Sequence, residues 1–202
     1  GTMTGGDATL PGSAGEAHGG TTWAGGTMGG NWVLASDHRL TTANGSTKHL
    51  SNATIANHGT LDWNSTEPLL GSSSTFTNHA LFESQGDMAL VWNSGGRPLF
   101  VNEATATLRA APGKTMTNTS FDFTNNGGEL EAGAAGAIVY NGPTNRFNAG
   151  TRFTGAGQNI VNGTARFVDA YTSANLLLQA GSFEGGTGAG TKAVAQGSTR
   201  WS

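Results

Sequence analysis

Two carboxylates, Asp62 and Glu83, have the spacing that acid–base chemistry would require in a repeat protein. Each lies seven residues after the large apolar residue of a repeated phrase, Ile55 for Asp62 and Phe76 for Glu83. If successive repeats stack as neighbouring strands, the two carboxylates point out of the same wall about 4.8 Å apart. Glycosidases use two carboxyl groups about 5–9 Å apart. The pair is therefore either a set of hydrolase acids or two exposed carboxylates on a solvated face.

His58 and His79 are a second candidate pair, because each directly follows the asparagine of the repeated phrase. Stacked repeats would place the two imidazoles about 5 Å apart. Zn²⁺ sites take three or four ligands, and the other histidines do not share this position: they are His18, His38 and His49. We interpret His58 and His79 as exposed turn residues and expect no metal site.

Two other runs resemble functional motifs in spelling only. Asp37-His38-Arg39 is a compact ionisable run, but nothing in the sequence marks a nucleophile to go with it. Gly186-Thr187-Gly188-Ala189-Gly190 has no strong strand before it and no helix after it, as a phosphate loop requires. We expect no catalytic residue and no cofactor, and predict that the protein is not an enzyme.

Two tryptophans, Trp63 and Trp92, lie in short alternating stretches. Aromatic side chains that point out of a wall stack on sugar rings, whereas inward ones fill the core. Both interpretations are open for Trp63 and Trp92, which are the candidate glycan contacts.

The elements that would position these groups follow from the repeated phrase itself: a large apolar residue, any residue, then Asn. The first four copies lie 21, 24 and 23 residues apart, and a degenerate copy, Phe147-Asn148-Ala149-Gly150, begins 24 residues after Phe123. Repeats of this length without helical periodicity are typical of a β-helix. The copies are Ile55-Ala56-Asn57, Phe76-Thr77-Asn78, Phe100-Val101-Asn102, Phe123-Thr124-Asn125 and Ile160-Val161-Asn162, and their apolar partners are Leu61, Phe82, Leu108, Leu130 and Phe167.

The asparagines of the phrase are predicted to form a buried ladder. Side chains alternate faces along a strand, so an inward Phe76 implies an inward Asn78. Asn tolerates turn conformations and caps turn amides. Stacked copies would bond to one another, and the predicted ladder is Asn57, Asn78, Asn102, Asn125 and Asn162. The glycines that follow, Gly59, Gly127 and Gly163, are expected at corners that need a positive φ.

Length and composition favour one ordered, all-β domain. The 202 residues include 33 Gly and no Cys; 11% are charged and 36% hydrophobic, with a net charge of −3. Disordered chains combine low hydrophobicity with high net charge, so order is expected. We predict a single parallel β-helix of about 8–9 coils with 21–24 residues each, covering residues 1–202 as a segment of a longer chain. Residues 1–50 would form irregular coils, 51–170 regular coils, and 171–202 a last coil with a Gly-rich loop.

The same numbers argue against two classes of partner. The Lys and Arg residues number 10 and form no stripe. The positively charged surface that nucleic-acid binding requires is therefore not expected. No apolar run approaches the roughly 20 residues that span a bilayer, so membrane insertion is not expected.

Several phrases resemble the repeats of very large secreted bacterial surface proteins. They are Trp23-Ala24-Gly25-Gly26-Thr27-Met28-Gly29-Gly30, Gly45-Ser46-Thr47-Lys48-His49-Leu50, the stretch from Ile55 to Trp63, and Phe147-Asn148-Ala149-Gly150. The resemblance covers roughly residues 21–167, with departures at Asn102-Glu103-Ala104 and at Phe147-Asn148. It implies a right-handed parallel β-helix of adhesin or autotransporter-passenger type on the bacterial cell surface.

We therefore expect a non-catalytic, monomeric, extracellular segment that acts as a rod or as a binding surface for glycans or another surface protein. One alternative is a carbohydrate-active β-helix, a polysaccharide lyase or glycoside hydrolase, with Asp62 and Glu83 as its acids. Another is a trimeric shaft similar to a phage tailspike.

Overall fold

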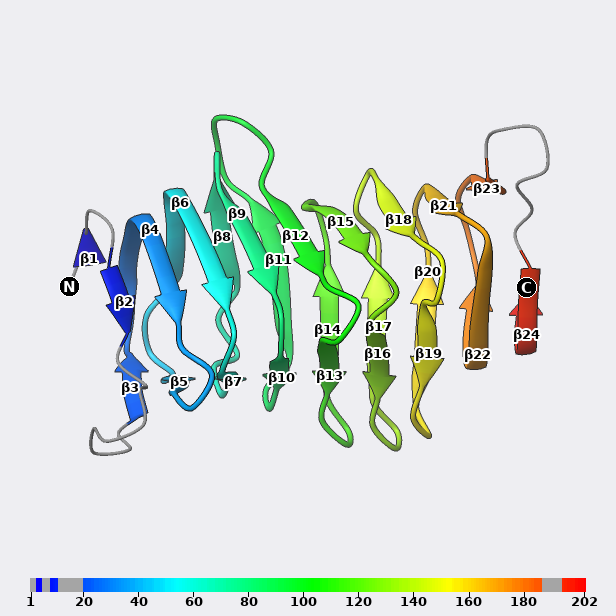
Figure 1. Cartoon of the computed structure of the whole chain (residues 1–202), viewed down its shortest axis with the longest axis horizontal. Coiled ribbons are helices and arrows are strands. Elements are labelled where there is room, and N and C mark those ends of the chain that lie inside the picture. Colours follow the sequence, from blue (N-terminus) through cyan, green and yellow to red (C-terminus); the bar gives the residue numbers. More distant parts are fainter. Residues whose placement is uncertain (1–2, 5–7, 11–19, 187–193) are drawn as a thin grey trace.

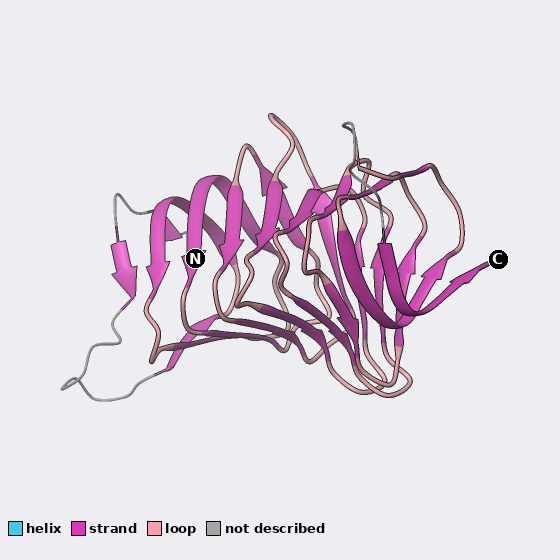
Figure 2. Ribbon diagram, turned by 45° about the vertical axis from the view of Figure 1, so that its right-hand side comes forward, coloured by secondary structure: helices cyan, strands magenta, loops and turns pink. Residues whose placement is uncertain are grey.

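The computed structural model describes residues 3–4, 8–10, 20–186 and 194–202. Their strands pair in parallel and wind as a β-solenoid of about 8 turns, which confirms the predicted fold. In Figure 1 the turns follow one another along the long axis in chain order, from β1 to β24. These residues contain no helix (Figure 2), and hence none long and apolar enough to cross a membrane.

Each turn contributes one strand to each of three side walls. The first, the ladder wall, carries the repeated phrase, and its short strands alternate outward and buried residues. Its strands are β2 (Ala8–Leu10), the second half of β4 (Gly26–Leu34), the second half of β6 (Lys48–Asn57), β9 (Thr75–Asn78), β12 (Leu99–Asn102), β15 (Asp122–Asn125), β18 (Asn145–Phe147), β21 (Ala165–Phe167) and β23 (Phe183–Glu184).

The second, the charged wall, carries all four ion pairs found among the described residues. Its strands are β3 (Gly20–Trp23), β5 (Arg39–Thr42), β7 (Thr60–Trp63), β10 (Leu81–Ser84), β13 (Thr107–Ala110), β16 (Glu129–Ala132), β19 (Arg152–Thr154) and the first halves of β22 (Ala170–Leu178) and β24 (Val194–Trp201).

The third, the apolar wall, carries half-buried aliphatic side chains on its outer face, among them Leu70, Val91 and Val139. Its strands are β1 (Met3–Thr4), the first halves of β4 and β6, β8 (Leu69–Ser72), β11 (Met88–Trp92), β14 (Thr115–Asn118), β17 (Ala137–Tyr140), β20 (Gln158–Val161) and the second halves of β22 and β24.

The core consists of columns of apolar side chains that repeat from turn to turn. Phe76 lies opposite Ile55 on one side and Phe100 on the other. The rings of Phe76 and Phe100 stack with centroids 5.1 Å apart, and Phe100 stacks on Phe123 at 5.8 Å. Since burying one Phe side chain stabilises by about 1.5–3 kcal/mol, these columns are a main source of the stability of the solenoid. The predicted partners form a second column on the charged wall: Leu61, Phe82, Leu108 and Leu130.

The repeat shifts by two residues at β18. Phe147 pairs with Asn125, and Asn145 pairs with Phe123, so the alignment of Phe147 with Phe123 was wrong. A shift of two residues keeps the same side chains facing inward. Phe147 therefore stays in the core, but it occupies a position that the ladder uses in earlier turns.

The fifth copy of the phrase was also misassigned. Ile160 lies on the apolar wall, where it pairs with Val139 and Leu177, and Val161 rather than Ile160 points inward. Its expected partner, Phe167, lies on the ladder wall opposite Phe147. Which residues of a strand point inward depends on where the preceding corner ends. The spacing of residue types along the chain does not show where that corner is.

Glycine is required at the corners for two different physical reasons. Gly127 has a φ of 91°, as predicted. Gly59 and Gly163 do not have a positive φ, but a Cβ on Gly59 would lie 2.3 Å from the carbonyl oxygens of Ala35 and His38. Close approach of neighbouring turns therefore explains the glycine there.

Candidate functional site

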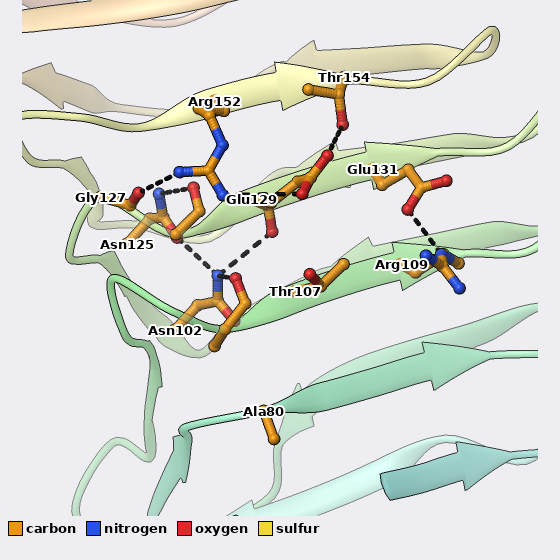
Figure 3. A network of polar contacts seen from close by, with 12 residues as sticks. Ala80, Asn102, Thr107, Arg109, Asn125, Gly127, Glu129, Glu131, Arg152 and Thr154 are labelled. Carbon is orange, nitrogen blue, oxygen red and sulfur yellow. Dashed lines mark hydrogen bonds and ion pairs between the residues drawn. The ribbon is translucent and has the colours of Figure 1, made fainter.

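The repeated asparagines form a buried hydrogen-bonded ladder at the corner between the ladder wall and the charged wall. Asn57 Nδ2 donates to Asn78 Oδ1 at 2.7 Å, Asn78 Nδ2 to Asn102 Oδ1 at 2.8 Å, and Asn102 Nδ2 to Asn125 Oδ1 at 2.8 Å. Figure 3 shows Asn102 and Asn125 on neighbouring turns, joined by this bond. The ladder ends at Thr151, whose Oγ1 accepts a bond from Asn125 Nδ2 at 2.9 Å.

The ladder is a structural device and not a binding site, because its members are buried. Each spare amide hydrogen is used on a corner carbonyl: Asn78 donates to Thr107 O at 3.0 Å and Asn125 to Gly128 O at 2.9 Å. Asn162, the predicted fifth member, is exposed on the apolar-wall side and lies outside the ladder. That part of the prediction was wrong.

Two further asparagine pairs at other corners were missed. Asn118 Nδ2 donates to Asn145 Oδ1 at 3.2 Å, and Asn159 Nδ2 donates to Asn175 Oδ1 at 2.9 Å. Met116-Thr117-Asn118 has the same apolar–any–Asn spelling as the repeat. That spelling was the signal that could have identified the first of these pairs.

The charged wall brings Asp62 and Glu83 onto adjacent strands in register, as expected. Each carboxylate, however, is paired with an arginine. Asp62 Oδ2 pairs with Arg39, and its side chain is 7% exposed. Glu83 lies 3.7 Å from Arg109 Nη1. The two carboxylates therefore belong to ion pairs that tie turns together.

Arg109 is the centre of the longest of these ion-pair groups. Its Nε donates to Glu131 Oε2 at 2.6 Å, so Arg109 lies between Glu83 and Glu131 on three successive turns. Burial lowers the pKa of Arg109, but the hydrogen bond and charge of Glu131, helped by Glu83 and Glu129, raise it overall. Glu129 in turn accepts from Thr154 Oγ1 at 2.7 Å and lies 3.6 Å from Arg152 (Figure 3).

The two repeat histidines meet at the corner, as their phase predicts. The rings of His58 and His79 are 4.2 Å apart and inclined by 7°, and His58 is exposed. Burial and the neighbouring His79 both lower the pKa of His58. Within the described residues, no group of three His, Cys, Asp or Glu side chains is placed to hold a metal ion.

The compact run that includes His38 does not form a catalytic set. His38 is buried and its Nε2 lies 3.0 Å from Thr21 Oγ1, while Asp37 is exposed. Residues 187–190 of the Gly-rich run lie outside the described residues.

Trp63 is not a glycan contact, because it is 0% exposed. It ends β7 with the same inward phase as Leu61. Its ring packs edge-on against Trp23 at 6.3 Å and stacks on Phe82 at 6.4 Å. The core interpretation of this residue is correct.

Trp92 has the opposite environment, since it ends β11 where the chain leaves the apolar wall, and it is 40% exposed. The loop that follows, residues 93–98, projects beyond the other corners and is green at the top of Figure 1. Trp92 Nε1 donates to Ser94 O at 3.0 Å and to Gly95 O at 3.2 Å. The guanidinium carbon of Arg97 lies 4.8 Å from the ring centroid.

Polar groups surround the exposed part of Trp92. Asn93 Nδ2 lies 3.4 Å from His49 Nε2 on β6, which is separated from β11 by β8 on the apolar wall. Arg97 donates to Ser120 O at 3.4 Å. Across residues 20–186 and 194–202, no carboxylate lies within ion-pair distance of Arg97. We call the group formed by His49, Trp92, Asn93 and Arg97 the Trp92 platform.

Lys48 was missed entirely by the sequence analysis. It is fully buried, and its Nζ donates to Ala43 O, to Ser46 O at 2.8 Å and to Ser65 Oγ at 3.1 Å. Nζ also lies 6.0 Å from the centroid of Trp63. Burial lowers the pKa of Lys48, against a smaller opposite effect of Glu67. The alternation with inward Leu50 was the signal that could have identified an inward lysine.

Comparison with protein-family models, with curated proteins and with solved structures finds no match to this chain. What the protein does must therefore be inferred from its fold and its surface chemistry.

Proposed function

We propose that this β-solenoid is a non-catalytic, extracellular glycan-binding segment, and that the Trp92 platform is its binding site. The observation that supports this most directly is the exposure of Trp92 at the base of a projecting loop. Trp63 is buried in the core, whereas Trp92 presents ring surface to solvent beside amide, imidazole and guanidinium groups.

The chemistry of the platform suits a sugar. The apolar C–H faces of a pyranose pack on an aromatic ring, and planar polar side chains at the rim bond to its hydroxyl groups. Arg97 lies over one side of the indole and bonds to Ser120 O, which holds the cation in place. Asn93 and His49 supply the neighbouring donors and acceptors.

A glycan array probed with Trp92→Ala and Trp92→Phe tests the proposal. Loss of an aromatic contact of about 0.5–1.5 kcal/mol corresponds to a loss of about two- to thirteenfold in affinity, and we expect Trp92→Ala to weaken binding within this range. Trp92→Phe keeps a ring and should retain most of it.

Trp201→Ala is the matched control, because Trp201 is also exposed, at 71%, but lies on β24 far along the chain. It should bind as the unaltered protein does, with all variants showing the same melting profile. Equal binding by Trp92→Ala, or equal loss in Trp201→Ala, would contradict the proposed site.

The proposed location is the bacterial cell surface, and the proposed partners are glycans or another surface protein; both rest on the resemblance of the repeats. Protease treatment of intact cells that express the protein should remove it, and full protection would exclude an exterior location. We expect a monomer by light scattering, whereas a trimer would favour the tailspike-like alternative.

A carbohydrate-active enzyme is the second candidate, and the observation that favours it is the in-register placement of Asp62 and Glu83. The arginine partners of both carboxylates favour a structural role instead. Reducing-end assays on a polysaccharide panel separate the two: turnover that Asp62→Asn abolishes would establish the enzyme, and no turnover is expected.

A further inference from the structure

A second polar column runs outside the asparagine ladder, formed by the residue that follows the last residue of successive ladder-wall strands. The backbone places these residues on one line: His79 N donates to Asn57 O at 2.8 Å, and Glu103 N donates to Asn78 O at 2.9 Å. We call it the outer column, and its members are His58, His79, Glu103, Asn126 and Asn148.

The two ends of the outer column differ in how their side chains are satisfied. Asn148 Nδ2 donates to Asn126 Oδ1 at 2.7 Å, and Asn126 Nδ2 donates to Glu103 Oε2 at 3.1 Å. The carboxylate of Glu103 is thus tethered toward Asn126. His58 and His79 are left as an imidazole pair at the other end, stacked at 4.2 Å.

We propose that His58 and His79 together bind one divalent transition-metal ion, Cu²⁺, Ni²⁺ or Zn²⁺, with water at its remaining positions. Imidazole nitrogen is a preferred ligand of these ions, and the two rings lie next to each other on adjacent turns. The site goes beyond glycan binding, since it lies at a different corner from the Trp92 platform.

Both rings must reorient to share one ion. The ring centroids lie 4.2 Å apart in nearly parallel planes, whereas a bond from imidazole nitrogen to a metal lies in the plane of the ring. Each ring must therefore tilt so that one nitrogen of each comes within about 2.0–2.1 Å of the ion. His58 is exposed and His79 half-buried, and side-chain rotation can supply this movement without a change in the backbone.

A metal ligand must be the neutral imidazole, so protons compete with the ion for both rings. Glu103 is the next member of the outer column, and its carboxylate accepts a bond from Asn126, so it is not part of the proposed ligand set.

Calorimetric titration of the whole chain with Cu²⁺, Ni²⁺ and Zn²⁺ salts tests the site. We expect one ion per chain, at least tenfold weaker binding in His58→Gln and in His79→Gln, and weaker binding on acidification from pH 7.5 to 5.5. The loss is expected because the second imidazole binds intramolecularly. The electron paramagnetic spectrum of the Cu²⁺ form should show coupling to two imidazole nitrogens.

His49→Gln is the matched control, because His49 lies on the apolar wall, and it should bind the ion as the unaltered chain does. Absence of binding, binding unchanged in both His58→Gln and His79→Gln, or a Cu²⁺ spectrum with a single nitrogen would overturn the proposal. Glycan binding by the two glutamine variants should be unaffected, so this test is independent of the Trp92 platform.

Discussion

Replacement of Asn102 by leucine tests whether the asparagine ladder stabilises the solenoid. Asn102 is the third of the four ladder asparagines and is fully buried. Its Oδ1 accepts from Asn78, and its Nδ2 donates to Asn125 at 2.8 Å and to Glu129 O at 3.3 Å. Leucine has a similar size but can make none of these bonds.

The size of the expected loss in stability depends on which hydrogen-bond partners of Asn102 are left without a bond. Asn78 Nδ2 keeps Thr107 O at 3.0 Å and is therefore not orphaned. Asn125 Oδ1 loses the donor that Asn102 supplied, and a buried polar atom without a partner costs about 1–3 kcal/mol. We expect the free energy of unfolding to fall by about this amount, which corresponds to a melting temperature lower by about 2–12 °C for a chain of this length.

Urea unfolding followed by circular dichroism, together with calorimetry, measures the effect. Because stacked repeats can unfold in parts, the two methods should be compared before a single free energy is assigned. Asn162→Leu is the control, since Asn162 is exposed and outside the ladder, and it should change stability by less than about 0.5 kcal/mol.

Two results would refute the reasoning. One is an unchanged melting temperature in Asn102→Leu, which would mean that the amide bonds add nothing beyond side-chain volume. The other is an equal loss in Asn162→Leu, which would mean that asparagine matters for a reason unrelated to the buried ladder.

Two further predictions concern buried and half-buried charges. The pKa of Lys48 is lowered in the folded chain, so the unfolded chain binds more protons between that lowered pKa and 10.5. The stability of the unaltered protein relative to Lys48→Met should therefore rise as the pH increases through this window. Melting curves from pH 7 to 10.5 check this, and a stability difference that does not change with pH would contradict it. Arg109→Met should leave Glu83 and Glu131 on the charged wall without their shared cation. We expect the free energy of unfolding to fall by up to about 1 kcal/mol at low salt and by less in 1 M NaCl. A loss of stability that does not depend on salt would indicate lost packing of the arginine stem instead.

The fold could be predicted because the period and the inward phase of the repeat are both visible in residue types. Phe76, Phe100 and Phe123 recur with an asparagine two residues later, and a side-chain period of two forces both onto one face. These constraints leave few ways for successive turns to stack on one another. The ladder from Asn57 to Asn125 is the same inference carried to the strand end.

The surface was harder to predict, because exposure at a strand end depends on where the corner begins. Trp63 and Trp92 both end short alternating strands. Trp63 keeps the inward phase, whereas Trp92 is exposed at the end of β11, where the chain turns outward into the six-residue connection 93–98 before Leu99. Corner geometry involves contacts with the turns above and below, which no local pattern records.

At β18 the repeat of residue types fails, because the asparagine and the aromatic residue exchange positions, but the core stays packed. Asn145 takes the place of Phe123, and Phe147 takes the place of Asn125. Asn145 joins Asn118 and donates to Gly142 O at the corner that precedes the ladder wall. The aromatic ring moves two residues along the strand and still packs on Phe123, with the centroids 6.1 Å apart.

The ladder corner loses its asparagine by this exchange, but it does not lose its polar cap. Thr151 Oγ1 accepts the hydrogen that Asn125 would otherwise leave unpaired and donates to Asn148 O at 2.7 Å. The turn at β18 therefore keeps one buried aromatic ring and one satisfied polar cap, although the ring and the asparagine have exchanged positions. An orphaned buried amide costs about 1–3 kcal/mol. The hydroxyl of Thr151 avoids this cost at the one turn where Phe147 stands opposite Asn125 and a ladder asparagine is missing.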